Sequence, residues 1–251
     1  IRNVDGLLYE YNVPVPPNLY PKTWANGGEM RNSGMEILLS GIPFMNKDFE
    51  WNTSVTFSTN SNKLKSLDGS VFKSDLDYFN AGIDQVEYSG QVTYSHRVEV
   101  GKNIGNFHGF KVVDVDDEGK WIYLDRNGER VNYDDFTHAA DDKQVIGNGI
   151  PKCYAGWNNN FRYKNFDLSI TMRGAFGFQI LNGARMNYEN TKNSRVENRL
   201  KSVTHKVFGK VPLSKEVEPE YNSYYIEDGD YWKIDNITLG YTFGKVGKYI
   251  K

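Results

Sequence analysis

The histidines and the single cysteine are the side chains best suited to catalysis or metal binding, and their spacing supports neither. His96, His108, His138 and His205 are scattered, and no HExxH pair joins any two of them. Cys153 stands alone, which excludes a disulfide within the chain and a thiolate zinc cage. A serine nucleophile elbow and a lysine-bearing phosphate loop are also missing from the sequence. We therefore expect no catalytic residue, no enzyme activity and no cofactor.

An acidic segment, residues 114–135, offers oxygen ligands of the kind that calcium prefers. Within it, Asp125 and Asn127 precede a glycine, as in a fragment of a calcium loop, but the closing bidentate Glu is missing. A solvated β-hairpin with glycine turns explains the same residues and is the interpretation that we favour. The carboxylates of Asp141 and Asp142 are adjacent on one loop, so the sequence does not show a glycosidase pair facing across a cleft.

Aromatic side chains in the long connections are candidates for ligand contacts. Trp24, Trp121, Tyr188 and Tyr224 can stack on sugar rings or pack on a partner protein. The alternative is that these rings pack against one another inside the connections. The sequence assigns no residue to a particular ligand.

The composition limits the class of protein further. Lys and Arg number 30 against 32 Asp and Glu, a formal charge of -2, which argues against a nucleic-acid binder and against an acidic disordered tail. The mean hydropathy is -0.63, and no run of apolar residues is long enough for a transmembrane helix. The low mean hydropathy does not exclude a transmembrane barrel, because barrel strands alternate lipid-facing apolar and lumen-facing polar residues. No signal peptide begins at Ile1, so we expect a processed chain or a fragment.

Alternation of apolar and polar residues predicts an all-β protein. Residues 166–176 show it most clearly, with Phe166, Leu168 and Ile170 on one face and polar residues on the other. In the last strand the alternation slips by one residue, which predicts a bulge near Asp235-Asn236. We predict about eight antiparallel strands: roughly 7–13, 28–41, 49–61, 89–100, 105–115, 151–163, 166–177 and 231–243.

The connections between these strands alternate in length. Lys164-Asn165 is a two-residue hairpin turn, in which Asn tolerates positive φ. Loops longer than about 15 residues are uncommon in compact domains, whereas outer-membrane barrels have short periplasmic turns and long extracellular loops. We therefore predict part of a large transmembrane barrel, an up-and-down meander with a short helix within residues 184–209. The short connections are 42–48, 101–104, 164–165 and 244–248; the long ones, predicted to be extracellular, are 14–27, 62–88, 116–150 and 178–230.

Five sequence blocks carry a family resemblance, and they follow one another in the order found in that family. They are Gly28-Glu-Met-Arg-Asn-Ser-Gly-Met-Glu-Ile37, Val100-Gly-Lys-Asn-Ile-Gly-Asn-Phe-His-Gly-Phe110, Gln144-Val-Ile-Gly-Asn-Gly-Ile-Pro-Lys152, Phe161-Arg-Tyr-Lys-Asn-Phe-Asp-Leu168 and residues 227–243, which end Leu-Gly-Tyr-Thr-Phe. The blocks resemble barrel signatures of the SusC/RagA-type TonB-dependent outer-membrane transporters, and they span nearly the whole chain.

The resemblance implies a function as well as a fold. Residues 1–251 would be one partial barrel domain, the C-terminal part of the barrel without the plug and the last strands. About eight strands are about a third of a 22-stranded transporter barrel. The resemblance further implies import of glycan oligosaccharides or peptides across the outer membrane of a Gram-negative bacterium. The expected partners are a SusD-like surface lipoprotein, TonB through the absent plug region, and outer-membrane lipid, but no nucleic acid.

A soluble extracellular β-sheet protein that binds glycans or mediates adhesion is the alternative. The two hypotheses differ in the surroundings of the apolar face of the strands. In a barrel, this face points outward to lipid in a band about 25 Å tall. In a soluble sandwich, Phe57, Leu168, Ile170 and Leu239 would instead be buried between two sheets.

Overall fold

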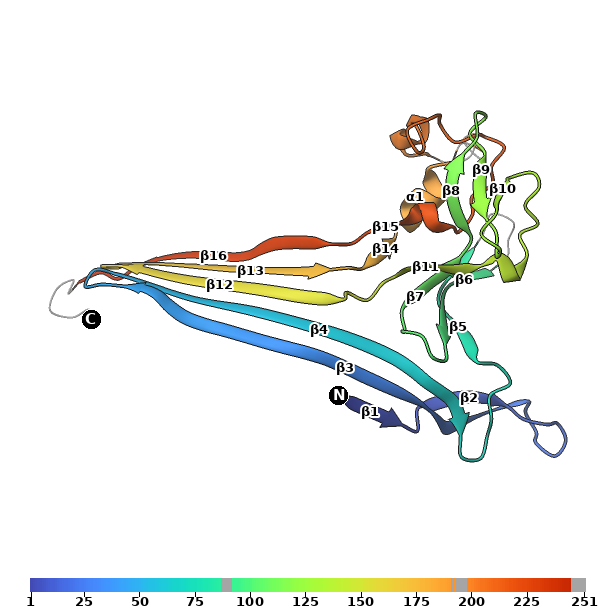
Figure 1. The fold of residues 1–251 in the computed structure, drawn as a ribbon, viewed down its shortest axis with the longest axis horizontal. Coiled ribbons are helices and arrows are strands. Elements are labelled where there is room, and N and C mark those ends of the chain that lie inside the picture. The colour runs from blue at the N-terminus through green and yellow to red at the C-terminus, as the bar shows by residue number, and fades with distance from the viewer. Residues whose placement is uncertain (87–91, 191, 193–197, 245–251) are drawn as a thin grey trace.

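The computed structural model describes residues 1–86, 92–190, 192 and 198–244, and their regular secondary structure is almost entirely β-strand (Figure 1). No helix among them is long and apolar enough to cross a membrane. The largest sheet, called the wall below, has seven strands. They are β1 (Arg2–Asp5), β2 (Leu8–Asn12), β3 (Lys22–Met45), β4 (Phe49–Gly69), β12 (Cys153–Tyr163), β13 (Phe166–Phe176) and β16 (Tyr231–Tyr241).

The wall is the predicted antiparallel meander. Strands β3, β4, β12, β13 and β16 are neighbours in chain order, while β1 and β2 both pair with β3. The predicted hairpin joins β12 to β13, but the residue with positive φ is Lys164 (φ 52°) rather than Asn165. The side chain of Asn165 instead donates a 2.8 Å hydrogen bond to the carbonyl of Thr242. The predicted bulge is confirmed, because Thr171 pairs with Asn236 and the next residue, Met172, pairs with Ile234.

Strands β3 and β4 are longer than the sequence predicts, with 24 and 21 residues. The predicted loop 14–27 is correspondingly shorter, because residues 22–26 pair with β2. The cause lies at Gly27 and Gly28, where the sequence pattern places the boundary between a loop and a strand. In the structure they lie within β3, where the pairing with β4 shifts register, and Gly28 has a φ of +76°. Glycines at such a bulge let the strand bend without ending it.

Two predicted wall strands, 89–100 and 105–115, lie outside the wall. A separate upper sheet has the order β11-β7-β6-β5, with β5 (Tyr78–Val86), β6 (Val92–Glu99), β7 (Asn106–Gly109) and β11 (Gln144–Asn148). The connection 101–104 was predicted to lie with the short turns, and this is wrong. It adjoins the C-terminal half of β4, away from the short turns, where the amide of Leu64 donates to the carbonyl of Lys102 at 3.2 Å. Strand β12 pairs with β4 only up to Thr59, so this turn hydrogen-bonds the edge of β4 that β12 leaves open.

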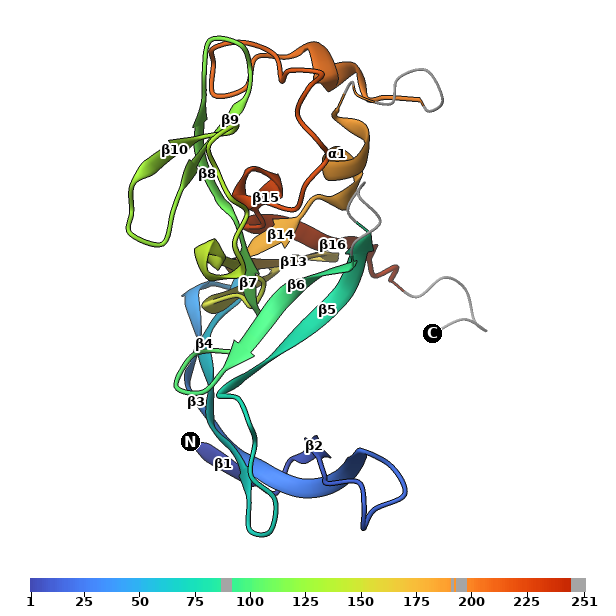
Figure 2. The same ribbon diagram turned by 90° about the vertical axis from the view of Figure 1, so that its right-hand side faces the viewer.

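The two longest connections fold together into a unit that we call the cap, residues 110–138, 179–190, 192 and 198–228. It lies beyond one end of the wall (Figures 1 and 2). Phe110, Trp121, Met186, Val217 and Tyr225 belong to its common hydrophobic core. The predicted short helix is present as α1. The cap elements are β8 (Lys111–Val115), β9 (Trp121–Leu124), β10 (Arg130–Asn132), β14 (Gln179–Leu181), α1 (Gly183–Tyr188), β15 (Ile226–Asp228) and the 3₁₀ turns η2 (Lys201–Thr204) and η3 (Ser223–Tyr225); η1 (Ala140–Asp142) follows the first cap segment.

Candidate functional site

One face of the wall is apolar across five neighbouring strands. The register places Leu39, Val55, Trp157, Met172 and Ile234 side by side in one row. The neighbouring row on one side contains Ile37, Phe57 and Trp232. On the other side, the next row contains Thr53, Asn159, Ile170 and Ile237, and the row after it contains Phe44, Trp51, Phe161, Leu168 and Leu239.

This apolar face is open to the surroundings. Ile237 is 61% exposed and Leu239 is 71% exposed. Within the residues that the structure describes, no second sheet covers this face, so the packing that a soluble sandwich requires is not seen.

The opposite face of the same strands is polar. A row directly beside the apolar one contains Ser40, Ser54, Asn158, Thr171 and Asn236. Ion pairs cross between strands on this face, from Arg162 to Glu50 at 2.5 Å and from Arg173 to Asp235 at 2.6 Å. A sheet with one apolar and one polar face fits between lipid and an aqueous lumen.

Aromatic rings mark the end of the wall that carries the short turns. Phe49, Tyr163, Phe166 and Tyr241 share the last row, and the rings of Phe166 and Tyr241 lie 4.6 Å apart. Eight residues further along β4, the row of Phe57 contains Trp232. Eight residues span about 26 Å along a strand, which matches the height of the apolar band of an outer-membrane barrel.

A polar pair lies inside the apolar face. Thr53 and Asn159 pair across β4 and β12, and Asn159 is only 3% exposed. The Thr53 hydroxyl donates to Asn159 Oδ1 at 2.9 Å, and Trp51 Nε1 donates to the same oxygen at 3.0 Å. The indole of Trp157 completes the cluster by donating to the Thr53 hydroxyl at 2.9 Å. Two indole N–H groups thus donate to this polar pair, one to each residue.

The aromatic ligand candidates in the connections divide into buried and exposed residues. Trp121 is 1% exposed, because the two long connections bury its ring between them, and this favours the alternative that the rings pack against one another. Tyr224 is half-buried, 5.1 Å from the ring of Trp121 and 4.9 Å from the guanidinium of Arg185. Trp24 at 64% and Tyr188 at 46% are exposed and remain candidates.

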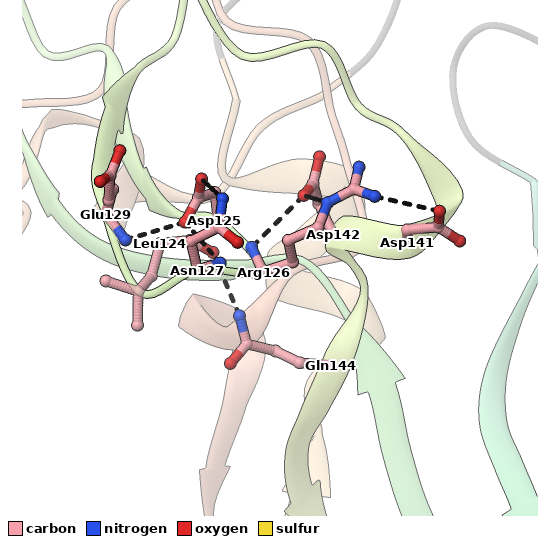
Figure 3. Close-up of polar contacts among 8 residues, drawn as sticks. All are labelled: Leu124, Asp125, Arg126, Asn127, Glu129, Asp141, Asp142 and Gln144. Carbon is pink, nitrogen blue, oxygen red and sulfur yellow. Dashed lines mark hydrogen bonds and ion pairs between the residues drawn. The ribbon is translucent and has the colours of Figure 1, made fainter.

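The calcium candidates form a turn rather than an open ligand set (Figure 3). Asp125 Oδ1 accepts the backbone amides of Asn127 and Glu129, both at 2.8 Å, and Oδ2 accepts the Asn127 side-chain amide at 3.3 Å. These bonds close the β9–β10 hairpin, which is the interpretation that the sequence favoured. Among the described residues, no group of three or more His, Cys, Asp or Glu side chains is arranged to hold a metal ion.

The neighbouring carboxylates anchor this hairpin. Arg126 binds Asp142 through Nε at 2.9 Å and Asp141 through Nη1 at 3.0 Å (Figure 3). The hydrogen bond from Arg126 lowers the pKa of Asp142. Both carboxylates therefore form ion pairs with the Arg126 guanidinium, which is a structural role rather than a catalytic one.

The histidines do not converge on one site. Burial lowers the pKa of His108 to about 4, helped by the positive charge of Arg97. His138 lies in the cap, with Nε2 3.0 Å from a Glu220 carboxylate oxygen. His96 packs against Phe107 in the upper sheet, with ring centroids 4.5 Å apart and the planes tilted by 39°.

An amide-lined cleft is the feature that the sequence interpretation missed. It has a volume of about 220 Å³ and lies between the 101–104 turn, the residues just before β12, and the part of β4 just beyond its last pair with β12. Asn60, Asn62, Asn103, Asn148 and Lys152 line it. Asn60 and Asn62 alternate with outward residues along β4, so a strand prediction extended beyond residue 61 would have placed both on the polar face.

The base of this cleft is fixed by internal hydrogen bonds. The Asn148 side-chain amide donates to the Ile104 carbonyl at 3.0 Å and to Asn106 Oδ1 at 2.7 Å. Its oxygen accepts the amide of Ile150 at 2.7 Å. The side chains that line the mouth of the cleft are therefore held on a rigid base.

Comparisons with known proteins agree with the geometry. No protein-family model matches the chain. The TonB-dependent receptor SusC of Bacteroides thetaiotaomicron is 28% identical over 98% of this chain and 24% of its own length. The TonB-dependent receptor P3 of Formosa agariphila is 28% identical over 88% of this chain and 23% of its own length. The chain thus spans about a quarter of the length of these relatives.

Solved structures show the same fold. The RagAB peptide importer in its "open-open" state superposes with a TM-score of 0.76 at 18% identity, covering 95% of this chain and 25% of that one. The "closed-closed" state gives 0.73 at 19%, covering 95% and 26%. These matches confirm the resemblance to SusC/RagA-type TonB-dependent proteins and the assignment of the wall to part of their barrel; the matched proteins are named as receptors and importers, not enzymes.

Proposed function

We propose that this chain forms part of the barrel wall and the outer cap of a TonB-dependent importer in the outer membrane of a Gram-negative bacterium. The observation that carries the proposal is the two-faced wall, with exposed apolar rows on one side and polar rows on the other. Residues 1–251 would form one partial barrel domain. The cap end of the wall would face outside the cell, and the short-turn end would face the periplasm.

The proposal extends to what the whole protein carries. The cargo would be oligosaccharides or peptides, too large for a porin. Energy would come from TonB acting on a plug region, and a SusD-like lipoprotein would sit over the cap. The similarity to TonB-dependent receptors and to RagAB supports this arrangement. The soluble glycan-binding alternative is not favoured, because its apolar face would have to be covered.

Spin labels on adjacent residues of β16 test the orientation of the wall. Ile237 lies on the apolar face and Thr238 on the polar face. Each would be changed to Cys in the full-length protein, on a background in which Cys153 and any other cysteines are Ser, and labelled with a nitroxide in lipid vesicles. We expect the label at 237 to collide with dissolved oxygen and the label at 238 with a water-soluble nickel chelate. Equal access of the nickel chelate to both labels would contradict the proposal.

A photocrosslinker tests the partner. Benzoylphenylalanine in place of Tyr188, which is exposed in the cap, should capture a surface lipoprotein in intact cells. The same group in place of Phe44, at the other end of the wall, serves as the control. Equal capture from both positions would remove the support for a partner on the cap.

A further inference from the structure

We propose that the amide-lined cleft binds the main chain of an extended peptide and its free α-carboxylate. This inference rests on the proposed function, because it names the class of cargo for the lumen-facing surface. At the mouth of the cleft, the side-chain amides of Asn60 and Asn62 make no hydrogen bond to the described residues of the protein.

Two asparagines at the mouth present unused amides. Asn60 and Asn62 both lie on the polar face of β4, and neither side chain makes a hydrogen bond within the described parts of the chain. Asn103, on the facing turn, uses only its Oδ1, toward the Ser61 hydroxyl at 3.5 Å. Each amide offers both a donor and an acceptor. The cleft thus combines a rigid base with free donor–acceptor pairs.

The spacing of the two asparagines matches an extended peptide. Residues two apart on a strand are about 6.6 Å apart. An extended peptide presents the N–H and C=O groups of one edge with the same two-residue repeat. If a peptide lies along β4, the side-chain amides of Asn60 and Asn62 can each hydrogen-bond its main chain, one at each two-residue repeat. These two asparagines then do not contact the side chains of the peptide.

The charge at the cleft fits the end of such a peptide. Lys152 lines the cleft, is exposed, and has no ion pair within the described residues. An ammonium group binds a carboxylate through a charge-assisted hydrogen bond, which is about twice as strong as a neutral one. We therefore place the α-carboxylate of the peptide at Lys152.

The lining favours a peptide over a sugar. None of the residues that line the cleft is aromatic, whereas the C–H face of a sugar ring packs best on an aromatic ring. The apolar lining consists of Ile104, Ile150 and Pro151, which suits short aliphatic side chains. A glycan is therefore the less favoured occupant, and the test separates the two.

Binding of defined probes to the full-length protein in detergent tests the inference. The probe is an octapeptide of alternating Ala and Ser, fluorescent at its N-terminus, as the free acid and as the C-terminal amide. Asn60→Leu and Asn62→Leu should each raise the Kd of both forms about fivefold, the effect of one lost hydrogen bond. Lys152→Gln should weaken only the free acid, about tenfold, and so remove the difference between the two forms.

Matched variants control for general effects. Asn160→Leu changes an exposed asparagine on the polar face of the wall far from the cleft, and Lys47→Gln changes an exposed lysine at the other end. Both should leave the Kd unchanged. Wild-type affinity in Asn60→Leu and Asn62→Leu, or equal binding of acid and amide by the unmodified protein, would overturn the proposal.

A sugar competitor distinguishes the two classes of cargo. If maltoheptaose displaces the peptide and Asn60→Leu weakens maltoheptaose binding, the cleft binds glycans and the peptide assignment is wrong. Absence of any peptide binding would also overturn it. Neither result affects the spin-label test of the wall, so failure of this inference and failure of the proposed function are separable.

Discussion

Trp157 and Thr53 are hydrogen-bonded across two strands on the apolar face of the wall, with the indole Nε1 2.9 Å from the threonine hydroxyl. Thr53 in turn donates to Asn159, which also accepts the indole of Trp51. Both indole N–H groups, the threonine hydroxyl and the Asn159 side-chain oxygen thus have partners inside the protein. Unsatisfied polar groups in hydrocarbon are costly, and this sharing avoids that cost.

Removal of the shared acceptor should destabilise the wall. Asn159→Leu leaves the Trp51 indole without its partner, which we expect to cost about 1–3 kcal/mol. The measurement is the thermal unfolding temperature of the full-length protein in lipid. Thr171→Val, on the polar face of the neighbouring strand, is the control and should change little.

Simultaneous replacement of Thr53 and Asn159 measures the energetic coupling between these two side chains. Thr53→Val combined with Asn159→Leu should cost less than the sum of the single changes, because the two side chains share one network. Strict additivity would contradict the coupling that the distances indicate.

The Asp125 turn predicts a difference between two substitutions at one position. Asp125→Ala removes the acceptor for the amides of Asn127 and Glu129, and loss of these bonds should cost about 1 kcal/mol. Asp125→Asn keeps an acceptor and should preserve the turn. Hydrogen exchange of the β9–β10 amides is the measurement, and equal exchange in both variants would show that the carboxylate does not close this hairpin.

The same substitutions bear on the calcium interpretation. Because the Asp125 oxygens are used by the turn, we expect calcium to leave the exchange of these amides unchanged at millimolar concentration. Protection by calcium that Asp125→Asn abolishes would restore the metal site.

Acid should loosen the cap through Asp114. Its carboxylate accepts Lys210 Nζ and Arg130 Nη2, each at 2.8 Å, and joins β8 to two other segments. The hydrogen bond from Lys210 and the other donors lower the pKa of Asp114 to about 2. The folded-state pKa lies below the unfolded value of about 3.9. The stabilisation is therefore complete above about pH 4 and is lost as the pH falls toward 2.

Pepsin, which is active in acid, can measure this loss. We expect cleavage within residues 111–132 to rise between pH 4 and pH 2 in the full-length protein, and Asp114→Asn to be cleaved readily at both values. Asp48→Asn, in a turn at the far end of the wall, should behave as the unmodified protein. A pH dependence that survives in Asp114→Asn would exclude this carboxylate as its cause.

The sequence predicted the wall better than the elements above it, for a physical reason. Strands such as 166–176 have one face toward lipid and one toward water, so apolar and polar side chains alternate along them and can be recognised from the local sequence. Trp121 shows the limit of this reasoning. Its burial depends on packing against Tyr224 and Tyr225, more than 100 residues away, and no local pattern indicates that two loops share a core. The amide cleft was missed similarly, because its lining comes from three separate segments.

A side chain at Gly174 should destabilise the wall, because the Trp232 ring lies close to this glycine. A Cβ at this position would be 2.5 Å from the Trp232 ring and 2.6 Å from the Phe176 ring, so even alanine forces these aromatics to move. Gly41, on the same wall, has nothing within 4 Å of its would-be Cβ. We expect Gly174→Ala to lower the temperature at which the barrel loses its folded, fast-migrating form in detergent gels. Gly41→Ala should leave it within error, since both changes add the same methyl group to a strand. Equal melting of the two variants would mean that the packing of Trp232 over Gly174 contributes nothing to the wall.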